Sequence, residues 1–181
     1  DLVRSRGLGD VYKRQGDYDM NDVIVEYERK VYFDKKNIVT KIVDEFTPVH
    51  DGATYVNAFA YQIDAAQIGD KITLPEGAIL EKETSSIIVM SNAKQNIGNK
   101  YVVTREFNGS FLKNQLLSYN PYIIVKYSQG EQNRTEVHLP KHKATAYANQ
   151  SLIGSNDDAY YIDRKGAYPF AIDIPVSYTH L

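Results

Sequence analysis

The sequence predicts a mostly β fold: an antiparallel β-sandwich of jelly-roll type with long ordered loops and little helix. Two observations support this prediction. The 181-residue chain contains 15 Tyr and 6 Phe together with many Val and Ile, residue types that favour strands. Apolar and polar residues also alternate over short segments separated by polar turns, and this period of two is typical of half-buried strands. Because no long helical pattern connects these segments, an antiparallel arrangement is favoured over a parallel one.

The composition fits one globular domain. A chain of 181 residues with 43% hydrophobic residues can bury a sizeable core. It contains no Cys, which excludes disulfides, thiolate metal sites and Cys nucleophiles. The formal net charge of −2 gives no reason to expect nucleic acid or an anionic membrane as a partner. No stretch approaches the ~20 apolar residues of a membrane-spanning helix, so we expect no direct membrane insertion.

The two ends of the chain look foreign to this domain. Residues 1–15, DLVRSRGLGDVYKRQ, have no apolar signal-peptide core and no helical or strand period, and they resemble translated adapter read-through from sequencing. Residues 176–181, VSYTHL, resemble the matching read-through at the opposite end. We therefore expect a single domain over residues 16–175, truncated at its C-terminus, between two non-native segments. We also expect any export signal or lipid anchor to lie outside this sequence.

The alternating pattern predicts the strands in order. In residues 23–33, one face of an extended chain would carry Val23, Val25, Tyr27, Val31 and Phe33, and the other would carry Glu26, Glu28 and Lys30. The turn at 34–37 and the alternating segment at 38–47 extend this strand into a long antiparallel hairpin. Pro48 is expected to end the hairpin, because proline cannot donate to the ladder. Further strands are expected at residues 53–63, 71–74, 78–81, 85–91, 101–106, 121–127, 135–139 and 169–174.

Two segments depart from the strand pattern. Residues 109–118 could place Phe111, Leu112 and Leu116 on one face of a short helix. Residues 139–175 contain several turn signals and are expected to form a long ordered loop ahead of the last strand. Loops of this length in a compact domain are often functional or carry a ligand.

The strongest candidate site is the acidic stretch GDYDMND. Its residues Asp17, Asp19, Asn21 and Asp22 could converge on one Ca²⁺, a hard cation that prefers oxygen ligands. The spacing resembles the start of an EF-hand, but Asp22 stands where that loop requires Gly and a strand pattern follows, so an EF-hand is excluded. Clustered carboxylates are costly without a cation, which favours calcium. The alternative is that these residues form Asx-turns and cap backbone amides ahead of the strand.

Other oxygen ligands could come from distant parts of the chain. Asp157 and Asp158 lie in a second acidic loop, and Asp51 and Asn57 are further candidates. For each of these residues the alternative is a solvated turn, since Asp and Asn dominate turns.

The sequence contains no strong catalytic motif. His138 and His142 have a helical metal spacing, but Pro140 lies between them and would break the helix, so zinc is not expected. There is neither a G-x-S-x-G elbow nor a Walker loop. The carboxylate pair of a glycoside hydrolase is spatial and not sequential, and nothing in the sequence points to one. We therefore expect a non-enzymatic protein.

Four stretches in a fixed order resemble the LruC-type domain, a poorly characterised domain of bacterial cell-envelope and secreted proteins that is frequent in Bacteroidetes. They are GDYDMNDVIVEYE, HDGATYVNAFAYQI, TEVHLP and PFAIDIP, and together they span residues 16–175. The resemblance implies an extracytoplasmic location, at the cell surface or secreted. In this resemblance the acidic motif of the family corresponds to Asp17, Asp19, Asn21 and Asp22, which look like the calcium loops of other secreted β-domains. The resemblance implies no catalytic residues.

The predicted function is a calcium-stabilised structural or binding module of a bacterial surface or secreted protein. Its partner would be an extracellular glycan or protein. A carbohydrate-binding or adhesin module is the alternative, in which Tyr160, Tyr161 and Tyr168 stack on sugar rings. These tyrosines could equally be ordinary core and surface aromatics. A hydrolase is the third alternative.

Overall fold

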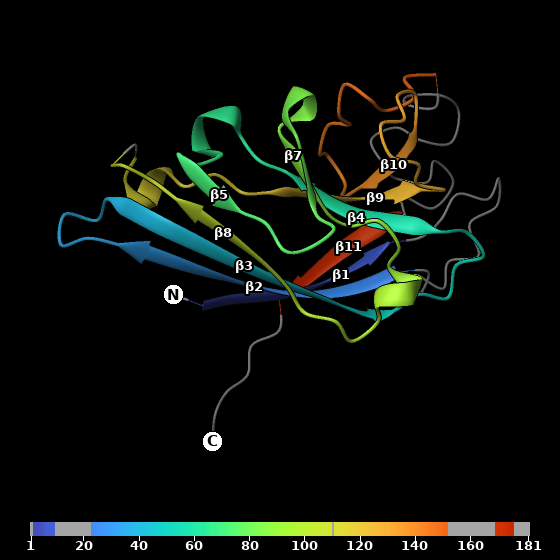
Figure 1. The fold of residues 1–181 in the computed structure, drawn as a ribbon, viewed down its shortest axis with the longest axis horizontal. Coiled ribbons are helices and arrows are strands. Elements are labelled where there is room, and N and C mark those ends of the chain that lie inside the picture. Colours follow the sequence, from blue (N-terminus) through green and yellow to red (C-terminus); the bar gives the residue numbers. More distant parts are fainter. Residues whose placement is uncertain (1, 10–22, 110, 152–168, 176–181) are drawn as a thin grey trace.

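The protein is a two-layer β-sandwich, and its two sheets pack face to face in Figure 1. The computed structural model describes residues 2–9, 23–109, 111–151 and 169–175. The first sheet has the strand order β11-β1-β2-β3-β8-β5, and the second has the order β10-β9-β4-β7-β6. Neighbouring strands run antiparallel in both sheets. The predicted antiparallel β-sandwich is therefore confirmed.

The strands lie close to their predicted positions. The first sheet contains β1 (Leu2–Gly9), β2 (Val23–Phe33), β3 (Val39–His50), β5 (Lys71–Thr73), β8 (Tyr101–Glu106) and β11 (Ala171–Pro175). The second contains β4 (Asn57–Gln62), β6 (Ile79–Glu81), β7 (Ser86–Met90), β9 (Asn120–Val125) and β10 (Thr135–His138). The chain crosses between the sheets at β3–β4, β4–β5, β5–β6, β7–β8, β8–β9 and β10–β11, so each sheet combines strands that are distant in sequence.

The prediction that Pro48 ends the hairpin is wrong. Strand β3 continues through Pro48 to His50. The register against β2 shifts at this point, because Ile24 pairs with His50 while the next residue, Val25, pairs with Pro48. Proline is tolerated at such a bulge, since the ladder is already interrupted there and the missing N–H leaves no hydrogen bond unmade.

The prediction of a helix at 109–118 is also wrong. In the described part of this segment, only a 3₁₀ turn at Lys113–Gln115 is helical. The segment instead adds to the start of β3: Leu112 forms an isolated bridge with Ile38, and the Val39 N–H donates to the Phe111 carbonyl at 3.0 Å. Pairing with a distant strand therefore overrides the weak helical pattern.

Helical structure elsewhere is limited to short turns. The described residues contain three further 3₁₀ turns, at Ala65–Gln67, Lys82–Thr84 and Lys94–Asn96. Within the described ranges, no helix has the length and apolarity that crossing a membrane would require.

The N-terminal segment takes part in the first sheet. Strand β1 pairs with β2 from Leu2 opposite Lys30 to Gly9 opposite Val23, and β11 pairs with its other edge. Residues 2–9 therefore form a strand although the segment shows no strand period in its sequence. The foreign origin of this segment stays a prediction, and residues 176–181 lie outside the described residues.

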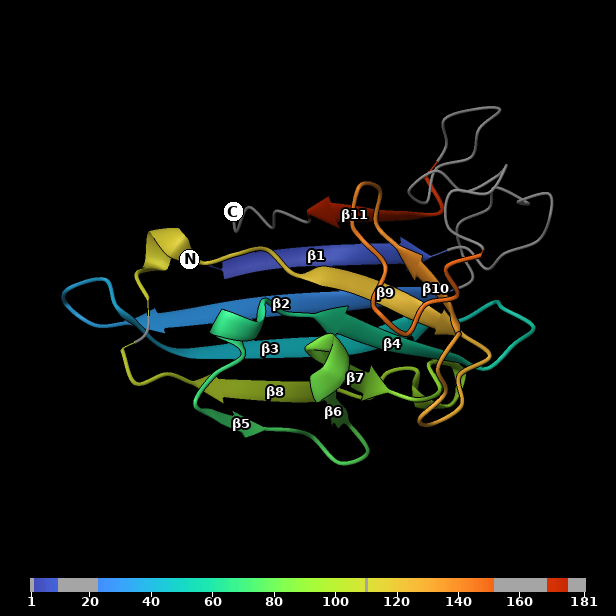
Figure 2. The same cartoon turned by 90° about the horizontal axis from the view of Figure 1, so that it is seen from above.

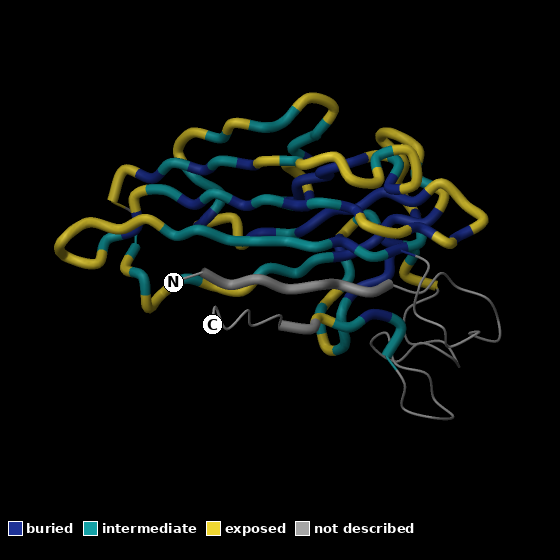
Figure 3. Tube along the Cα trace, turned by 90° about the horizontal axis from the view of Figure 1, so that it is seen from below, coloured by how far each residue is buried: buried dark blue, intermediate teal, exposed yellow. Residues whose placement is uncertain are grey.

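The main core fills the space between the sheets. Val25, Phe46 and Val103 point inward from the first sheet and pack against Phe59 and Ile87 of the second. In Figure 3 buried residues follow the strands, while exposed residues gather in the loops. This arrangement follows from the alternation of strand side chains between the two faces of a sheet.

The second sheet is also buried on its outer face. Ala58, Ala60, Ile88, Tyr122 and Ile124 form a separate apolar cluster there, and each is at most 2% exposed. The loop that follows β10 lies over this face, as Figures 1 and 2 show from two directions. The loop therefore acts locally as a third layer on the sandwich.

Several strand ends meet at one end of the sandwich, the right-hand end in Figure 2. Strand β2 begins there beside the end of β3, since Ile24 pairs with His50. Strand β4 begins there beside the end of β9, since Asn57 pairs with Val125. The loop at residues 51–56 is therefore next to the position where the chain enters β2.

Candidate functional site

Most of the predicted calcium ligands lie outside the described residues. These are Asp17, Asp19, Asn21, Asp22, Asp157 and Asp158. The tyrosines suggested for sugar stacking, Tyr160, Tyr161 and Tyr168, also lie outside them. Their roles stay predictions.

The two remaining candidates, Asp51 and Asn57, are both buried. Asp51 is 7% exposed, and its Oδ1 accepts a hydrogen bond from the Ala53 N–H at 3.0 Å, which forms an Asx-turn. This turn is buried, whereas the alternative considered for Asp51 was a solvated turn. Asn57 is fully buried, and neither Oδ1 nor Nδ2 of its side chain is hydrogen-bonded to a described residue. A buried amide without partners is costly, so this side chain requires an explanation.

The described residues contain no group of three His, Asp or Glu side chains that could hold a metal ion. His138 and His142 have separate surroundings. His138 is fully buried among polar side chains of the second sheet, while Nδ1 of His142 donates to the Pro140 carbonyl at 3.3 Å.

A cleft of about 270 Å³ lies between the two sheets beside β11. One wall comes from the inner face of the first sheet, and the other comes from β4, from the start of β9 with the residues before it, and from the residues after β10. Its aromatic lining consists of Tyr27, Phe46, Tyr61 and Tyr119, and its polar lining consists of Arg29, Ser118, His142 and Asp173. No motif in the sequence predicts this cleft. The residue that could have indicated it is Arg29, a charged residue at an inward-facing position of β2 between Tyr27 and Val31 on the same face.

A buried charge cluster lies at the base of this cleft. Asp44 and Arg105 are 1% and 0% exposed, and Arg105 Nη2 lies 3.5 Å from Asp44 Oδ2. Arg29 Nε lies 3.4 Å from Asp44 Oδ1, and the Tyr119 hydroxyl donates to Asp44 Oδ2 at 2.6 Å. Burial raises the pKa of the Asp44 carboxyl, and Arg105 and Arg29 oppose that rise. The cluster holds two guanidinium groups against one carboxylate.

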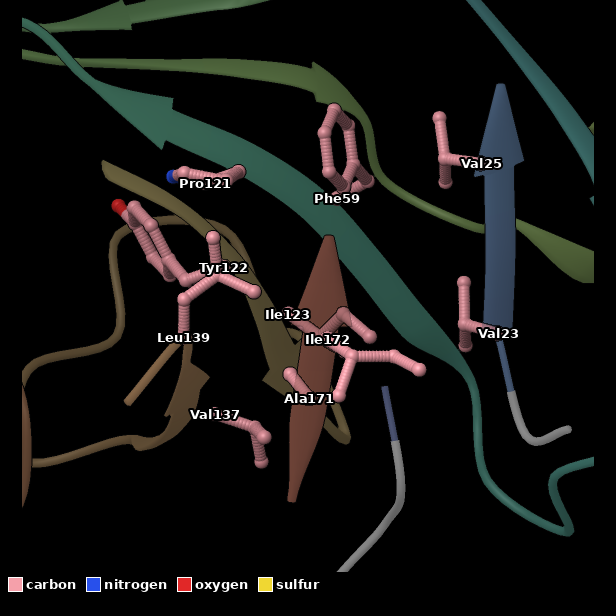
Figure 4. A pocket seen from close by; sticks show the side chains of 10 residues that line it. All are labelled: Val23, Val25, Phe59, Pro121, Tyr122, Ile123, Val137, Leu139, Ala171 and Ile172. Carbon is pink, nitrogen blue, oxygen red and sulfur yellow. The ribbon is translucent and has the colours of Figure 1, made fainter. Parts of the chain in front are cut away.

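The apolar side of the cleft continues into a smaller pocket, shown in Figure 4. This pocket has a volume of about 30 Å³, and the two cavities share Pro121 and Leu139. Val23, Phe59 and Ala171 line it among other core residues. A space of this size and polarity suits a packing gap more than a ligand.

A second group of buried charges lies on the outer face of the second sheet, and we call it the buried ion cluster: Glu81, Arg134, Glu136 and His138. Arg134 donates from Nη1 and Nη2 to the two carboxylate oxygens of Glu81 at 2.7 and 2.8 Å. Its Nε donates to Glu136 Oε1 at 2.7 Å, and His138 Nε2 lies 2.8 Å from Glu136 Oε2. All four residues are at most 8% exposed.

The buried ion cluster joins the two edges of the sheet. Glu81 ends β6 and Arg134 directly precedes β10, and these strands lie at opposite edges. Ala58 and Ala60 on the central strand leave room for long side chains to cross above them. The Tyr122 hydroxyl accepts a further hydrogen bond from Arg134 at 3.1 Å. The geometry therefore indicates a structural role for this cluster.

Hydrogen bonds also fix the proton on His138 Nδ1. Gln62 Nε2 donates to the Thr84 carbonyl at 2.8 Å, so Gln62 Oε1 accepts from Asn120 Nδ2 at 3.0 Å. Asn120 Oδ1 then faces His138 Nδ1 at 2.7 Å, and this nitrogen must donate. Burial lowers the pKa of His138, whereas the Glu136 carboxylate raises it. The lone pairs of His138 Nε2 and Glu136 Oε2 would repel at 2.8 Å, so a proton lies between these two atoms. This proton is shared by His138 and Glu136 and is not assigned to either residue alone.

The family comparison covers most of this fold. A model for a domain of unknown function, DUF4842, matches residues 37–181, more than half of the chain. The chain belongs to the DUF4842 family. The match includes β3 to β11, and with them Asp44, Arg105 and the whole buried ion cluster, but it begins after the acidic motif. No curated protein and no solved structure matches the chain.

The buried ion cluster should make this DUF4842 domain acid-sensitive. Burial raises the pKa of Glu136, but hydrogen bonds from His138 and Thr145 outweigh burial, so the pKa lies below the ordinary 4.5. A carboxyl with a depressed pKa stabilises the folded state above its unfolded pKa, and this contribution is lost as the pH falls through the folded value. We expect the free energy of unfolding to fall below pH 4.5. Urea unfolding from about pH 7 to about pH 3 measures this.

The matched variant for this titration is Glu136→Gln. It should be less stable than the original protein at neutral pH, because the carboxylate partner of Arg134 and His138 is lost. Its free energy of unfolding should depend less on pH in the acid range, because the group that titrates is absent. Equal acid dependence in the two proteins would contradict the assignment to Glu136.

Proposed function

We propose that this DUF4842 domain is a non-enzymatic, calcium-stabilised module of a bacterial cell-surface or secreted protein, with a binding or structural-display role. The resemblance of four sequence stretches to LruC-type domains supports the extracytoplasmic setting. The acidic motif at residues 16–22 supports calcium. The structural observation that carries the proposal is the buried amide of Asn57.

Asn57 supports this proposal because its buried side-chain amide forms no hydrogen bond with a described residue. Its side chain is fully buried, and its Oδ1 accepts no hydrogen bond from a described residue. Calcium readily takes an amide oxygen as a ligand, which would offset the cost of burying this group. The buried carboxylate of Asp51 belongs to the same end of the sandwich, because its neighbour His50 pairs with Ile24.

The acidic motif leads into this end of the sandwich. Its last residue, Asp22, directly precedes Val23, where β2 begins. The donor set of the motif together with Asp51 and Asn57 consists of carboxylate and amide oxygens only. This chemistry fits a hard cation and does not fit zinc or copper, which prefer nitrogen and sulfur ligands.

Calcium should raise the thermal stability of the protein. An ion that binds only the folded state stabilises it by about 2.7 kcal/mol at a free concentration of about 100 times Kd. For a chain of this size that corresponds to a rise of roughly 5–10 °C in Tm. Melting curves in excess calcium and in excess chelator measure the shift. Superimposed curves would contradict the proposal.

Two variants and a control locate the ion. Asp19→Ala and Asn57→Ala should each reduce the calcium-dependent rise in Tm, because each removes an oxygen ligand. Asn114→Ala is the matched control, since Asn114 is exposed in the 3₁₀ turn Lys113–Gln115, away from Asn57, and the change should leave the rise unchanged. A full calcium effect in both ligand variants would place the ion elsewhere.

A carbohydrate-binding role is the second candidate, and the aromatic-lined cleft beside β11 favours it. The cleft gives less support to a hydrolase. Among its described lining residues Asp173 is the single carboxylate, whereas most glycoside hydrolases use a pair of carboxylates.

A further inference from the structure

The cleft between the sheets contains an arginine, Arg29, with hydrogen-bond donors that no described residue uses. Arg29 directs Nε toward Asp44 at 3.4 Å, and its guanidinium group lies over the Tyr119 ring at 3.1 Å from the centroid. Its two terminal nitrogens make no hydrogen bond to a described residue. Stacking on the ring holds the guanidinium plane in place while its edge stays available. The side chain is 13% exposed, so the cleft reaches it.

The charges around Arg29 favour an anion. Arg29 and Arg105 share one buried carboxylate, Asp44, so the base of the cleft holds one positive charge in excess. A planar guanidinium with two free terminal nitrogens matches a carboxylate, which can accept two parallel hydrogen bonds. An anionic group bound there would neutralise the excess charge in surroundings that water screens poorly.

The mouth of the cleft provides groups that suit hydroxyls. Asp173 is exposed and accepts a hydrogen bond from the Tyr27 hydroxyl at 3.0 Å through Oδ2, which leaves Oδ1 as an acceptor. Ser118 contributes a hydroxyl. His142 uses Nδ1 to bond Pro140, so its Nε2 can pair with a ligand. Arg29 and Asp173 form no ion pair with each other, so both charges stay available to a ligand.

The size of the cleft limits the ligand. Its volume of about 270 Å³ lies just below the range of roughly 300–1,000 Å³ typical of drug-sized ligands, so it fits a single ring. The tyrosine and phenylalanine side chains along its walls provide apolar faces for such a ring.

We propose that this cleft binds a small ligand that carries both a carboxylate and hydroxyl groups, the chemistry of a uronic acid. The carboxylate pairs with the free edge of the Arg29 guanidinium, and the hydroxyls bond to Asp173, Ser118 and His142. Such a ligand could be a free sugar acid or the terminal residue of an acidic polysaccharide. The inference rests on the binding role proposed above and is independent of calcium.

Calorimetric titration of the full chain with glucuronate, glucose and acetate tests the ligand class. Glucuronate should bind saturably. Glucose lacks the carboxylate and acetate lacks the ring and hydroxyls, so each should bind about 10-fold or more weakly. Equal binding of glucose and glucuronate would overturn the proposal, as would the absence of saturable binding up to about 10 mM glucuronate. Binding of an oligouronate as well as the monomer identifies a polysaccharide end, and binding of the monomer alone identifies a free sugar acid.

Variants locate the binding. Arg29→Gln should weaken glucuronate binding by about 10-fold or more, because a charged hydrogen-bonding pair is lost. Lys71→Gln is the matched control: Lys71 is 69% exposed on β5, at the opposite edge of the first sheet, and the affinity should not change. A folded Arg29→Gln protein with unchanged affinity would overturn the proposal.

A second variant covers the case in which Arg29→Gln does not fold. Asp173→Asn at the exposed mouth leaves the buried charges intact and should lower the affinity for glucuronate while the melting curve stays the same. Unchanged affinity in this variant would overturn the proposal, because the proposed ligand bonds to Asp173 at the mouth of the cleft. Repeating the titration in chelator separates the two proposals. If glucuronate still binds in chelator and calcium does not change the melting curve, the cleft proposal is supported and the calcium proposal is rejected. If calcium raises the Tm but glucuronate does not bind, the calcium proposal is supported and the cleft proposal is rejected.

Discussion

Replacing Arg134 by methionine should lower the free energy of unfolding by about 3–5 kcal/mol, because the change leaves two buried carboxylates without their cation. Arg134 is 2% exposed and holds Glu81 through two hydrogen bonds at 2.7 and 2.8 Å. Methionine keeps much of the volume, so the effect reports the charge more than a cavity. We expect the Tm to fall by roughly 10 °C. Urea unfolding followed by circular dichroism suits a chain that has no Trp.

A control and a double variant test the cause. Lys100→Met also removes a cation that pairs with a glutamate, Lys100 to Glu45 at 2.8 Å, but Lys100 is 62% exposed, so the loss should be at most about 1 kcal/mol. Combining Arg134→Met with Glu81→Met should recover part of the lost stability, since it removes the carboxylate that was left unpaired. If Arg134→Met costs no more than Lys100→Met, the buried ion cluster does not stabilise the fold as described.

The second large effect is expected for Asp44→Asn, which should also cost about 3–5 kcal/mol. Asp44 is the shared partner of Arg29 and Arg105, and it accepts the Tyr119 hydroxyl at 2.6 Å. Asparagine has nearly the same shape, so the packing of the core is retained while two guanidinium groups lose their counter-ion. Equilibrium unfolding in urea measures the difference.

The neighbouring residue provides the control for this change. Glu45 follows Asp44 in β3 but points to the other face of the sheet, where it pairs with Lys30 and Lys100 near solvent. Glu45→Gln should therefore change the free energy of unfolding by at most about 1 kcal/mol. Similar losses in the two variants would show that burial does not distinguish the two carboxylates.

The sandwich could be predicted because its signal is local. In β2, Val23, Val25, Tyr27, Val31 and Phe33 recur at every second position, with Arg29 as the one charged exception, while Glu26, Glu28 and Lys30 lie between them. A period of two places these two sets on opposite faces of a strand. The same pattern located the later strands to within a few residues. It failed where a partner strand decided the outcome, as at Pro48, where a bulge accommodates proline, and at Leu112, which pairs with Ile38.

The candidate sites were predicted much less completely. Arg29, Asp44 and Arg105 each occupy an inward-facing strand position, which is an unusual place for a charge and is visible in the sequence. Nothing in the sequence shows that the three side chains meet, because they belong to β2, β3 and β8. The pairing of Glu81 with Arg134 is equally invisible, since 53 residues separate them.

By itself, the sequence determined the fold class, most strand positions, the absence of cysteine chemistry and an acidic motif suited to calcium. Tertiary structure alone decided which strands pair, which faces are covered and which charges share a buried site. The physical reason is the distance along the chain over which each kind of interaction acts. Alternation and turn propensity act between residues that are adjacent in the chain, whereas the cost of burying a charge is offset only by groups that folding brings from elsewhere. The cleft at Arg29 and the cluster at Arg134 both arise in this second way.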